Sequence, residues 1–329
     1  MCICLRKCID GLTVKHLRAM STKCLGAVVF GAGIAGKVRI RDISACDSGV
    51  VGAKLVGFVS RRQLEIDGAI QITEDEAFQR PDVDVVLVCT EPGAHEPVIR
   101  KALANGKHVL VEFPVCSSAS VTSELLSVAT EKGLVLHEEN IALLTPSHLS
   151  MKERLEKTNS TILKGELQLS ANYNGWVEDF QKSGGPFCVN VSLIQTFYDL
   201  LGNDLQATGG QLEINEAGFT ATATLTCSKC RDLTITLRRS KERQPRNKKM
   251  TFTLEDGTII DDTPGVTPPP AEGVPQPSKK PGLFMQDFLQ FVDKVKGVKD
   301  SGANTARTLH CIQVAENIHR FMGLELQKL

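Results

Sequence analysis

The sequence from Leu25 to Gly36 reads Leu-Gly-Ala-Val-Val-Phe-Gly-Ala-Gly-Ile-Ala-Gly, and it decides the fold. A short apolar run that leads into Gly31-x-Gly33-x-x-Gly36 is typical of the start of a dinucleotide-binding βαβ unit. The first glycine permits a tight turn, the second lets backbone N–H groups approach a pyrophosphate, and the third lets the next helix pack on the sheet. Ile34 and Ala35 begin that predicted helix, whose positive end would face the phosphates.

Length and composition limit the class of protein. A chain of 329 residues is long enough for two domains. Its formal charge is zero, so the sequence indicates no general attraction to nucleic acid or to an anionic membrane. No apolar run approaches the roughly 20 residues that cross a bilayer. We therefore expect no nucleic-acid partner, no membrane contact, and a monomer or weak oligomer.

The 11 cysteines are odd in number and scattered, which favours a reducing compartment and a cytoplasmic protein. Cys227-Ser-Lys-Cys230 has the spacing of half a zinc site or of a redox pair. No second pair with suitable spacing follows it, so we interpret it as a hairpin turn with two incidental thiols.

A second parallel strand is predicted at Lys54 to Val59, and the residues that follow it indicate the cofactor. Ser60, Arg61 and Arg62 stand where an NAD site would place an acidic residue for the ribose 2′-hydroxyl. A hydroxyl and two guanidinium groups suit a 2′-phosphate instead. NADPH is therefore the expected cofactor, and NADH use is left open. The alternative is a solvated basic turn.

Further buried strands are predicted at 84–89, 108–112 and 134–139, with helices at 34–44, 74–78, 96–105 and 120–132 between them. This alternation predicts an α/β fold, a doubly wound parallel sheet over residues 25–145. Residues 1–24 are interpreted as a disordered extension.

Ligands of such sheets bind at the carboxyl ends of the strands, so the residues placed there are the site candidates. Thr90 and His95 follow one strand, and His95 would either touch the nicotinamide end of the cofactor or cap the next helix. Glu112 ends the following strand, where it would contact the ligand region or cap a helix. Glu139 ends the last strand beside His137, where acids could tune one another's pKa and donate a proton. A solvent-facing polar end is the alternative.

Beyond residue 145 the pattern changes to strands at 161–173, 217–226, 233–239 and 249–254, with one long helix at 189–201. This predicts a mostly antiparallel sheet in an α+β domain over residues 146–329. Lys241 to Lys249 is interpreted as a solvated hairpin loop, and the proline-rich segment 264–281 as an extended connection. Terminal helices are expected at 282–295 and 304–322. Aromatic residues that could line a cleft or form core are Tyr173, Trp176, Phe180 and Phe187.

The glycine motif, Thr90 to His95, the run Ala104 to Pro114 and the later sheet resemble the glucose–fructose oxidoreductase/inositol dehydrogenase family. Within it, the chain is similar to the members that reduce a linear tetrapyrrole. The resemblance implies hydride transfer from NADPH to the central methine carbon of biliverdin, which gives bilirubin in heme degradation, while a pyrrole nitrogen takes a proton. It names Glu112, Phe113 and Glu139 as catalytic candidates.

This sequence departs from the family pattern at several positions. Phe113 replaces the acid/base lysine of the sugar dehydrogenases and the usual tyrosine of the tetrapyrrole reductases. A phenyl ring cannot move a proton, which favours a substrate whose reduction needs mainly hydride placement. Of a proposed terminal zinc site only His310 and Cys311 are kept, so we predict no metal. Two alternatives stay open: an oxidoreductase of the same family that acts on a diol or carbonyl, and a non-catalytic protein that binds NADP or a tetrapyrrole.

Overall fold

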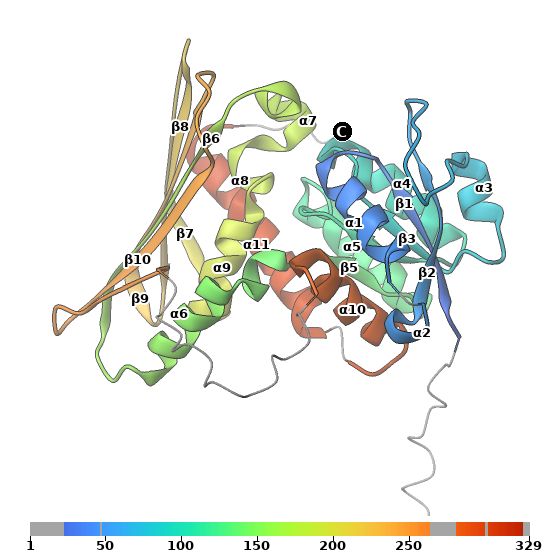
Figure 1. Cartoon of the computed structure of the whole chain (residues 1–329). Coiled ribbons are helices and arrows are strands. Elements are labelled where there is room, and N and C mark those ends of the chain that lie inside the picture. Colours follow the sequence, from blue (N-terminus) through green and yellow to red (C-terminus); the bar gives the residue numbers. More distant parts are fainter. Residues whose placement is uncertain (1–22, 47, 264–280, 300–301, 325–329) are drawn as a thin grey trace, which may run out of the picture.

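The computed structural model describes residues 23–46, 48–263, 281–299 and 302–324. The chain forms two units, each built on one sheet, with the last two helices between them (Figure 1). The predicted extension 1–24 lies outside the described residues except for its last two positions. The proline-rich segment also lies outside them, except for Pro281.

The first sheet has five parallel strands in the order β2-β1-β3-β4-β5. Their order reverses at β1, so the carboxyl ends of β1 and β3 flank a crevice of the kind in which open α/β sheets bind ligands. The strands are β1 (Leu25–Phe30), β2 (Ala53–Val59), β3 (Val85–Val88), β4 (His108–Val111) and β5 (Leu136–Glu138). The predicted doubly wound parallel sheet is confirmed.

Helices cover both faces of this sheet, which explains why its strands are continuously apolar. One face packs on α1 (Ile34–Ser44) and α10 (Leu283–Val295), and the other on α3 (Glu74–Gln79), α4 (His95–Ala104) and α5 (Ala119–Glu131). From α10 come Met285, Phe288, Phe291 and Val292, all within 4% exposure. A helix near the end of the chain thus completes the core of the first sheet (Figure 1).

The second sheet has six strands in the order β11-β10-β6-β9-β8-β7, antiparallel except for the pair β6 and β9. They are β6 (Ile162–Asn172), β7 (Gln206–Asn215), β8 (Gly218–Cys227), β9 (Cys230–Ser240), β10 (Asn247–Leu254) and β11 (Ile259–Asp261). The mostly antiparallel sheet is confirmed. The sequence pattern missed β7 and β11, because β7 is an edge strand with largely exposed residues and two glycines, and β11 has three residues.

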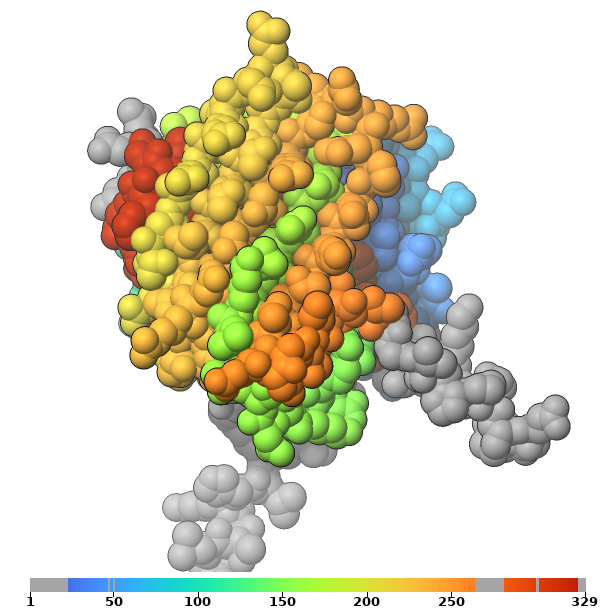
Figure 2. Space-filling model, turned by 90° about the vertical axis from the view of Figure 1, so that its left-hand side faces the viewer, coloured from blue at the N-terminus to red at the C-terminus, as the bar shows by residue number. Residues whose placement is uncertain are grey.

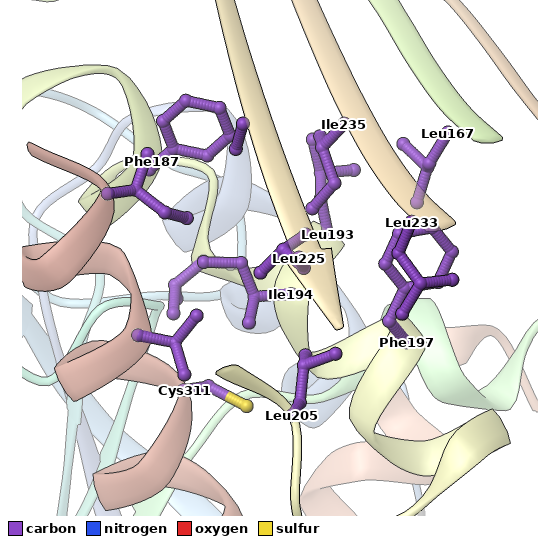
Figure 3. Packing of buried hydrophobic residues seen from close by; sticks show 14 of the residues in the cluster. Leu167, Phe187, Leu193, Ile194, Phe197, Leu205, Leu225, Leu233, Ile235 and Cys311 are labelled. Carbon is purple, nitrogen blue, oxygen red and sulfur yellow. The ribbon is translucent and has the colours of Figure 1, made fainter. Parts of the chain in front are cut away.

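One face of the second sheet packs on α8 (Gly185–Cys188), α9 (Val191–Leu201) and α11 (Gly302–Phe321). Figure 3 shows Phe187, Phe197 and Cys311 from these helices in one cluster with Leu225, Leu233 and Ile235 of the strands. Figure 2 shows the other face, where the strands themselves form the surface. Phe187 is core, Tyr173 and Phe180 contact Phe219 edge-on, and Trp176 is partly exposed.

Two interpretations of the second half were wrong. Lys241 to Lys249 does not close a hairpin, because β6 lies between β9 and β10 and the connection crosses it. The helix α6 (Pro146–Lys157) was not expected. Thr145 caps it and Pro146 occupies its first turn, but only His148 and Met151 are buried, so its apolar stripe is too narrow to recognise.

The predicted hairpin turn at Cys227 and Cys230 is confirmed, since these residues lie opposite each other where β8 turns into β9, and both are buried. Remaining short elements are α2 (Ser48–Val51), α7 (Phe180–Ser183), and the 3₁₀ turns Pro92–Ala94, Ile141–Leu144 and Gly175–Glu178. In the part of the chain that the structure describes, no helix combines the length and apolar character needed to cross a bilayer.

Candidate active site at the carboxyl edge of the parallel sheet

The glycine turn between β1 and α1 has the geometry that its sequence predicts. Gly31 has φ +92°, and a Cβ there would lie 2.6 Å from the Cys89 carbonyl oxygen. A Cβ on Gly36 would lie 1.9 Å from the Gly31 carbonyl oxygen, so α1 can approach β1 only with glycine at this position. A Cβ on Gly33 would meet nothing within 4 Å. The space above Gly33 is therefore open to a ligand.

The start of α1 offers unpaired donors to that space. Gly33 is its N-cap residue and no side chain of the described residues caps the helix, so the first backbone N–H groups are available for an anion. Ile34 is 91% exposed and Ala35 half-buried in the first turn. Thr90, at the end of β3, has a buried hydroxyl without a hydrogen-bond partner among the described residues. Open space, free N–H groups and an orphaned hydroxyl together fit a dinucleotide.

The turn after β2 presents Ser60, Arg61 and Arg62 at this same edge, with both arginines exposed. Gln71 holds the turn: its amide nitrogen donates to the carbonyls of Ser60 and Arg62 at 3.0 Å, and its oxygen accepts from the Leu64 N–H. The sequence analysis did not identify Gln71, because its contact with a turn eleven residues earlier leaves no pattern in the sequence.

His95 lies inside the protein and not on the surface of the edge. It is fully buried at the start of α4, with ring nitrogens 2.8 Å from the Pro114 carbonyl and 3.0 Å from the Thr90 carbonyl. Burial lowers the pKa of His95. The ring thus ties the loop after β3 to the segment after β4. Beside Thr90, Glu91 reaches back across β1 to Arg61, with 3.6 Å between Oε1 and Nη2.

Sheet register brings the two predicted acids together. The Glu112 N–H donates to the Val88 carbonyl and the Glu139 N–H to the Val111 carbonyl, so both acids stand one residue beyond neighbouring strands. Paired residues of parallel strands point to the same face. Cys89, Glu112 and Glu139 therefore form one row on the face that α1 and α10 cover.

Glu112 is the member of this row that reaches the surface, with its side chain 16% exposed. Its Oε1 accepts from Arg39 Nε at 2.7 Å, and Cys89 Sγ lies 3.9 Å away. Burial raises the pKa of Glu112, and the charge of Arg39 partly opposes the rise. In the described chain, Oε2 accepts no hydrogen bond and keeps solvent contact.

Glu139 is buried behind Glu112. One oxygen accepts from the Ile141 N–H, and the other has no partner among the described residues. Burial and the negative charges of Glu112 and Asp287 raise the pKa of Glu139 well above its usual range. These surroundings favour the protonated form of the Glu139 carboxyl.

Glu138 points to the opposite face and has a different role from its neighbour. It accepts from the Val115 N–H at 3.0 Å, from Thr308 Oγ1 at 2.9 Å, and from the amide of Gln195. Because these donors come from the segment after β4, from α11 and from α9, Glu138 joins the two units. Phe113 lies half-buried against the core of the second unit.

Arg39 and Asp287 are site residues that the sequence did not reveal. Arg39 lies on α1 but is not a surface charge, since it is 1% exposed and bound to Glu112 and Asp287. Asp287 could have been noticed in the sequence as a single acidic residue on the apolar face of a predicted helix.

Among the described residues, no three potential ligands gather to hold a metal. His310 donates toward the Leu205 carbonyl and Cys311 is core. A hollow of about 1200 Å³ lies between the start of α5 and α11 rather than over the glycine turn. Its lining includes Pro92 and Gly93 of the loop after β3, but no residue of the glycine turn.

Fold and site together define the class of the protein as an NAD(P)H-dependent oxidoreductase. Residues 25–140 match the model of the "Oxidoreductase family, NAD-binding Rossmann fold". Human biliverdin reductase A is 32% identical over 314 residues, which are 93% of this chain and 98% of that protein. The chain belongs to this oxidoreductase family, the glucose–fructose oxidoreductase/inositol dehydrogenase family that its motifs resemble.

Two other similarities show how far the likeness extends. The crystal structure of biliverdin reductase from Synechocystis sp. PCC 6803, with biliverdin and NADP⁺, matches with a TM-score of 0.74 and 20% identity. The match covers 91% of this chain and 99% of that one. The dTDP-3,4-didehydro-2,6-dideoxy-alpha-D-glucose 3-reductase of Saccharopolyspora spinosa is 40% identical, but over 79 residues, 24% of each chain. The predicted fold and the nicotinamide cofactor are confirmed.

Proposed function

We propose that this protein is an NADPH-dependent reductase that converts biliverdin to bilirubin in heme degradation. The observation that carries the proposal is the similarity to human biliverdin reductase A along almost the whole chain, whereas the similarity to the sugar 3-reductase covers 24%. Phe113 supports it, because oxidation of a sugar alcohol by the family's usual route needs a proton-transferring side chain at that position. The eight described cysteines are free thiols, which supports a cytoplasmic location.

The residues at the sheet edge would bind the cofactor as follows. Backbone N–H groups at Gly33, Ile34 and Ala35 would hold the pyrophosphate, and Gly31 and Gly36 would make that approach possible. Ser60, Arg61 and Arg62 would hold the 2′-phosphate. Thr90 would contact the nicotinamide half, with His95 fixing its loop from inside. When bound, the nicotinamide supplies the hydride.

The chain itself would manage the proton that a pyrrole nitrogen takes. Glu112 is partly exposed at the sheet edge, and Glu139, whose raised pKa favours the protonated form, would hold a proton behind it. Glu112 would contact both cofactor and substrate, and Phe113 would offer an apolar surface to the flat tetrapyrrole. These assignments follow from position and chemistry.

Mixing the protein with biliverdin and NADPH should therefore cause a loss of biliverdin absorbance, faster than with NADH. A heat-unfolded sample is the control. Turnover of a small diol or carbonyl compound in place of biliverdin would favour another reductase of the family. Binding of NADPH and biliverdin without turnover would favour a non-catalytic protein.

Replacing Arg61 and Arg62 by Ala should weaken NADPH binding at least about tenfold and leave NADH binding nearly unchanged. Each charge-assisted contact to a phosphate contributes roughly 1.5–3 kcal/mol, and 1.4 kcal/mol is about tenfold in affinity. Nucleotide fluorescence titration measures both constants. Arg80→Ala is the matched control, because Arg80 is exposed and pairs with Asp82 near the amino ends of the strands. Equal losses for both nucleotides would argue against a 2′-phosphate contact.

A further inference from the structure

A row of buried hydrogen bonds joins α10 to the candidate catalytic carboxylate. Arg39 Nε donates to Glu112 Oε1 at 2.7 Å, and Arg39 Nη2 donates to Asp287 Oδ2 at 3.0 Å. Asp287 is fully buried, although it follows Arg39 by 248 residues in the chain. One guanidinium therefore bridges a carboxylate at the sheet edge and a carboxylate of a helix from the far end of the sequence.

Asp287 is itself held in place from the other side. Its Oδ1 accepts from His137 Nε2 at 2.9 Å and from the Asn140 N–H at 3.3 Å. His137 Nδ1 lies 2.9 Å from Lys294 Nζ and 3.2 Å from Asn304 Nδ2, both of which are donors. Burial lowers the pKa of His137, so a neutral ring with its proton on Nε2 satisfies every one of these contacts. Asp287 therefore remains the charged partner of Arg39.

Packing of α10 gives no reason of its own for a buried ion pair at this place. Apart from this group of polar contacts, α10 packs on the first sheet through apolar side chains, and a buried ion pair is commonly no more stabilising than apolar residues of the same size. Arg39 also packs over the Phe284 ring, with its Cζ 5.0 Å from the ring centroid. Its Nη1 donates to the Phe284 carbonyl oxygen at 3.4 Å. Each of these contacts fixes the guanidinium, and its Nε then fixes one oxygen of Glu112.

We propose that Arg39 and Asp287 are positioning residues, which hold Glu112 by Oε1 so that Oε2 faces the cofactor and substrate. Asp287 orients Arg39, and Arg39 orients Glu112. The inference rests on the proposed function only in that it takes Glu112 to face the reacting groups. Helix α10 thereby becomes part of the active site without reaching its surface.

Arg39→Met and Asp287→Asn should move the pH dependence of NADPH affinity in opposite directions. The charged groups facing Glu112 are Arg39 from α1, Asp287 from α10, Glu139 after β5 and the thiol of Cys89 after β3. Loss of the cation raises the pKa of Glu112, whereas loss of the like charge lowers it. The part of the pH curve that reports the ionisation of Glu112, the Glu112 limb, should shift by about one pH unit or more. Loss of packing alone would not give opposite signs.

Three further variants make the test decisive. Glu112→Gln should abolish the limb, and a limb that survives would refute the role of Glu112 and with it the proposed site. Arg39→Lys keeps the charge but cannot span both carboxylates, so it should leave the Glu112 limb in place and lower turnover about tenfold. It also replaces Arg39→Met in the test if that variant does not fold. Asp293→Asn, an exposed change on the same helix, should behave like the unmodified protein. Limbs that stay in place, or move together, would overturn the inference.

Discussion

Gly33→Ala is expected to leave the protein folded but to weaken dinucleotide binding by at least about tenfold, whereas Gly36→Ala is expected to disrupt the fold. Gly33 has φ −75°, which alanine adopts freely, and its Cβ would meet nothing within 4 Å. The methyl group would occupy the space through which a pyrophosphate approaches the N–H groups of α1. Losing one such charge-assisted contact costs roughly 1.5–3 kcal/mol.

At Gly36 the conflict lies within the protein. Its Cβ would stand 1.9 Å from the Gly31 carbonyl oxygen, so α1 must move away from β1. Overpacking of this kind costs about 1–3 kcal/mol or more. Thermal unfolding followed by circular dichroism and fluorescence titration with NADPH separate the two effects. Unchanged NADPH affinity in Gly33→Ala, or unchanged stability in Gly36→Ala, would contradict the assigned roles.

The parts of the fold that sequence predicts are those whose signal is local. β1 consists of six buried residues and is followed by three glycines of fixed spacing, and helices such as α4 and α9 carry wide apolar faces. β7 and α6 were not predicted, because both are largely exposed and their sequences therefore carry no clear alternation of apolar and polar residues. Pairing in the second sheet could not be predicted, because nothing local states that β6 lies between β9 and β10.

The candidate site divides along the same line. Glu112 and Glu139 could be found because each follows a recognisable buried strand. Arg39 could not be found, since its two partners lie 73 and 248 residues away and its helix also carries Lys37 and Arg41, so that it resembles one more surface charge. The roles of Glu138 and Glu139 differ because successive strand residues face opposite sides of the sheet, which decides their partners only once the helices are placed.

Glu139→Gln is expected to lower biliverdin turnover about a hundredfold or more and, at the same time, to stabilise the protein at alkaline pH. Proton transfer by a positioned group contributes about 10²- to 10⁴-fold, and glutamine has no proton to give. Its amide keeps the carbonyl that accepts from the Ile141 N–H. The remaining turnover would rely on correct placement of the hydride, with water as the source of the proton.

The stability effect follows from the raised pKa of Glu139. Burial, with the charges of Glu112 and Asp287, makes the folded state bind this proton more tightly than the unfolded state does. The corresponding stability is fully present below the unfolded pKa of about 4.3 and is lost as pH rises through the folded pKa. Glutamine cannot ionise, so the variant should gain on the unmodified protein between pH 5 and pH 9.

Urea midpoints at pH 5 and pH 9, together with turnover of biliverdin, measure both effects. Glu131→Gln, an exposed change at the end of α5, is the matched control and should alter neither. A stability difference that is the same at both pH values would mean that Glu139 is ionised throughout the range. Full turnover in Glu139→Gln would move the proton source elsewhere, leaving Glu112 as the group at the edge that can supply it.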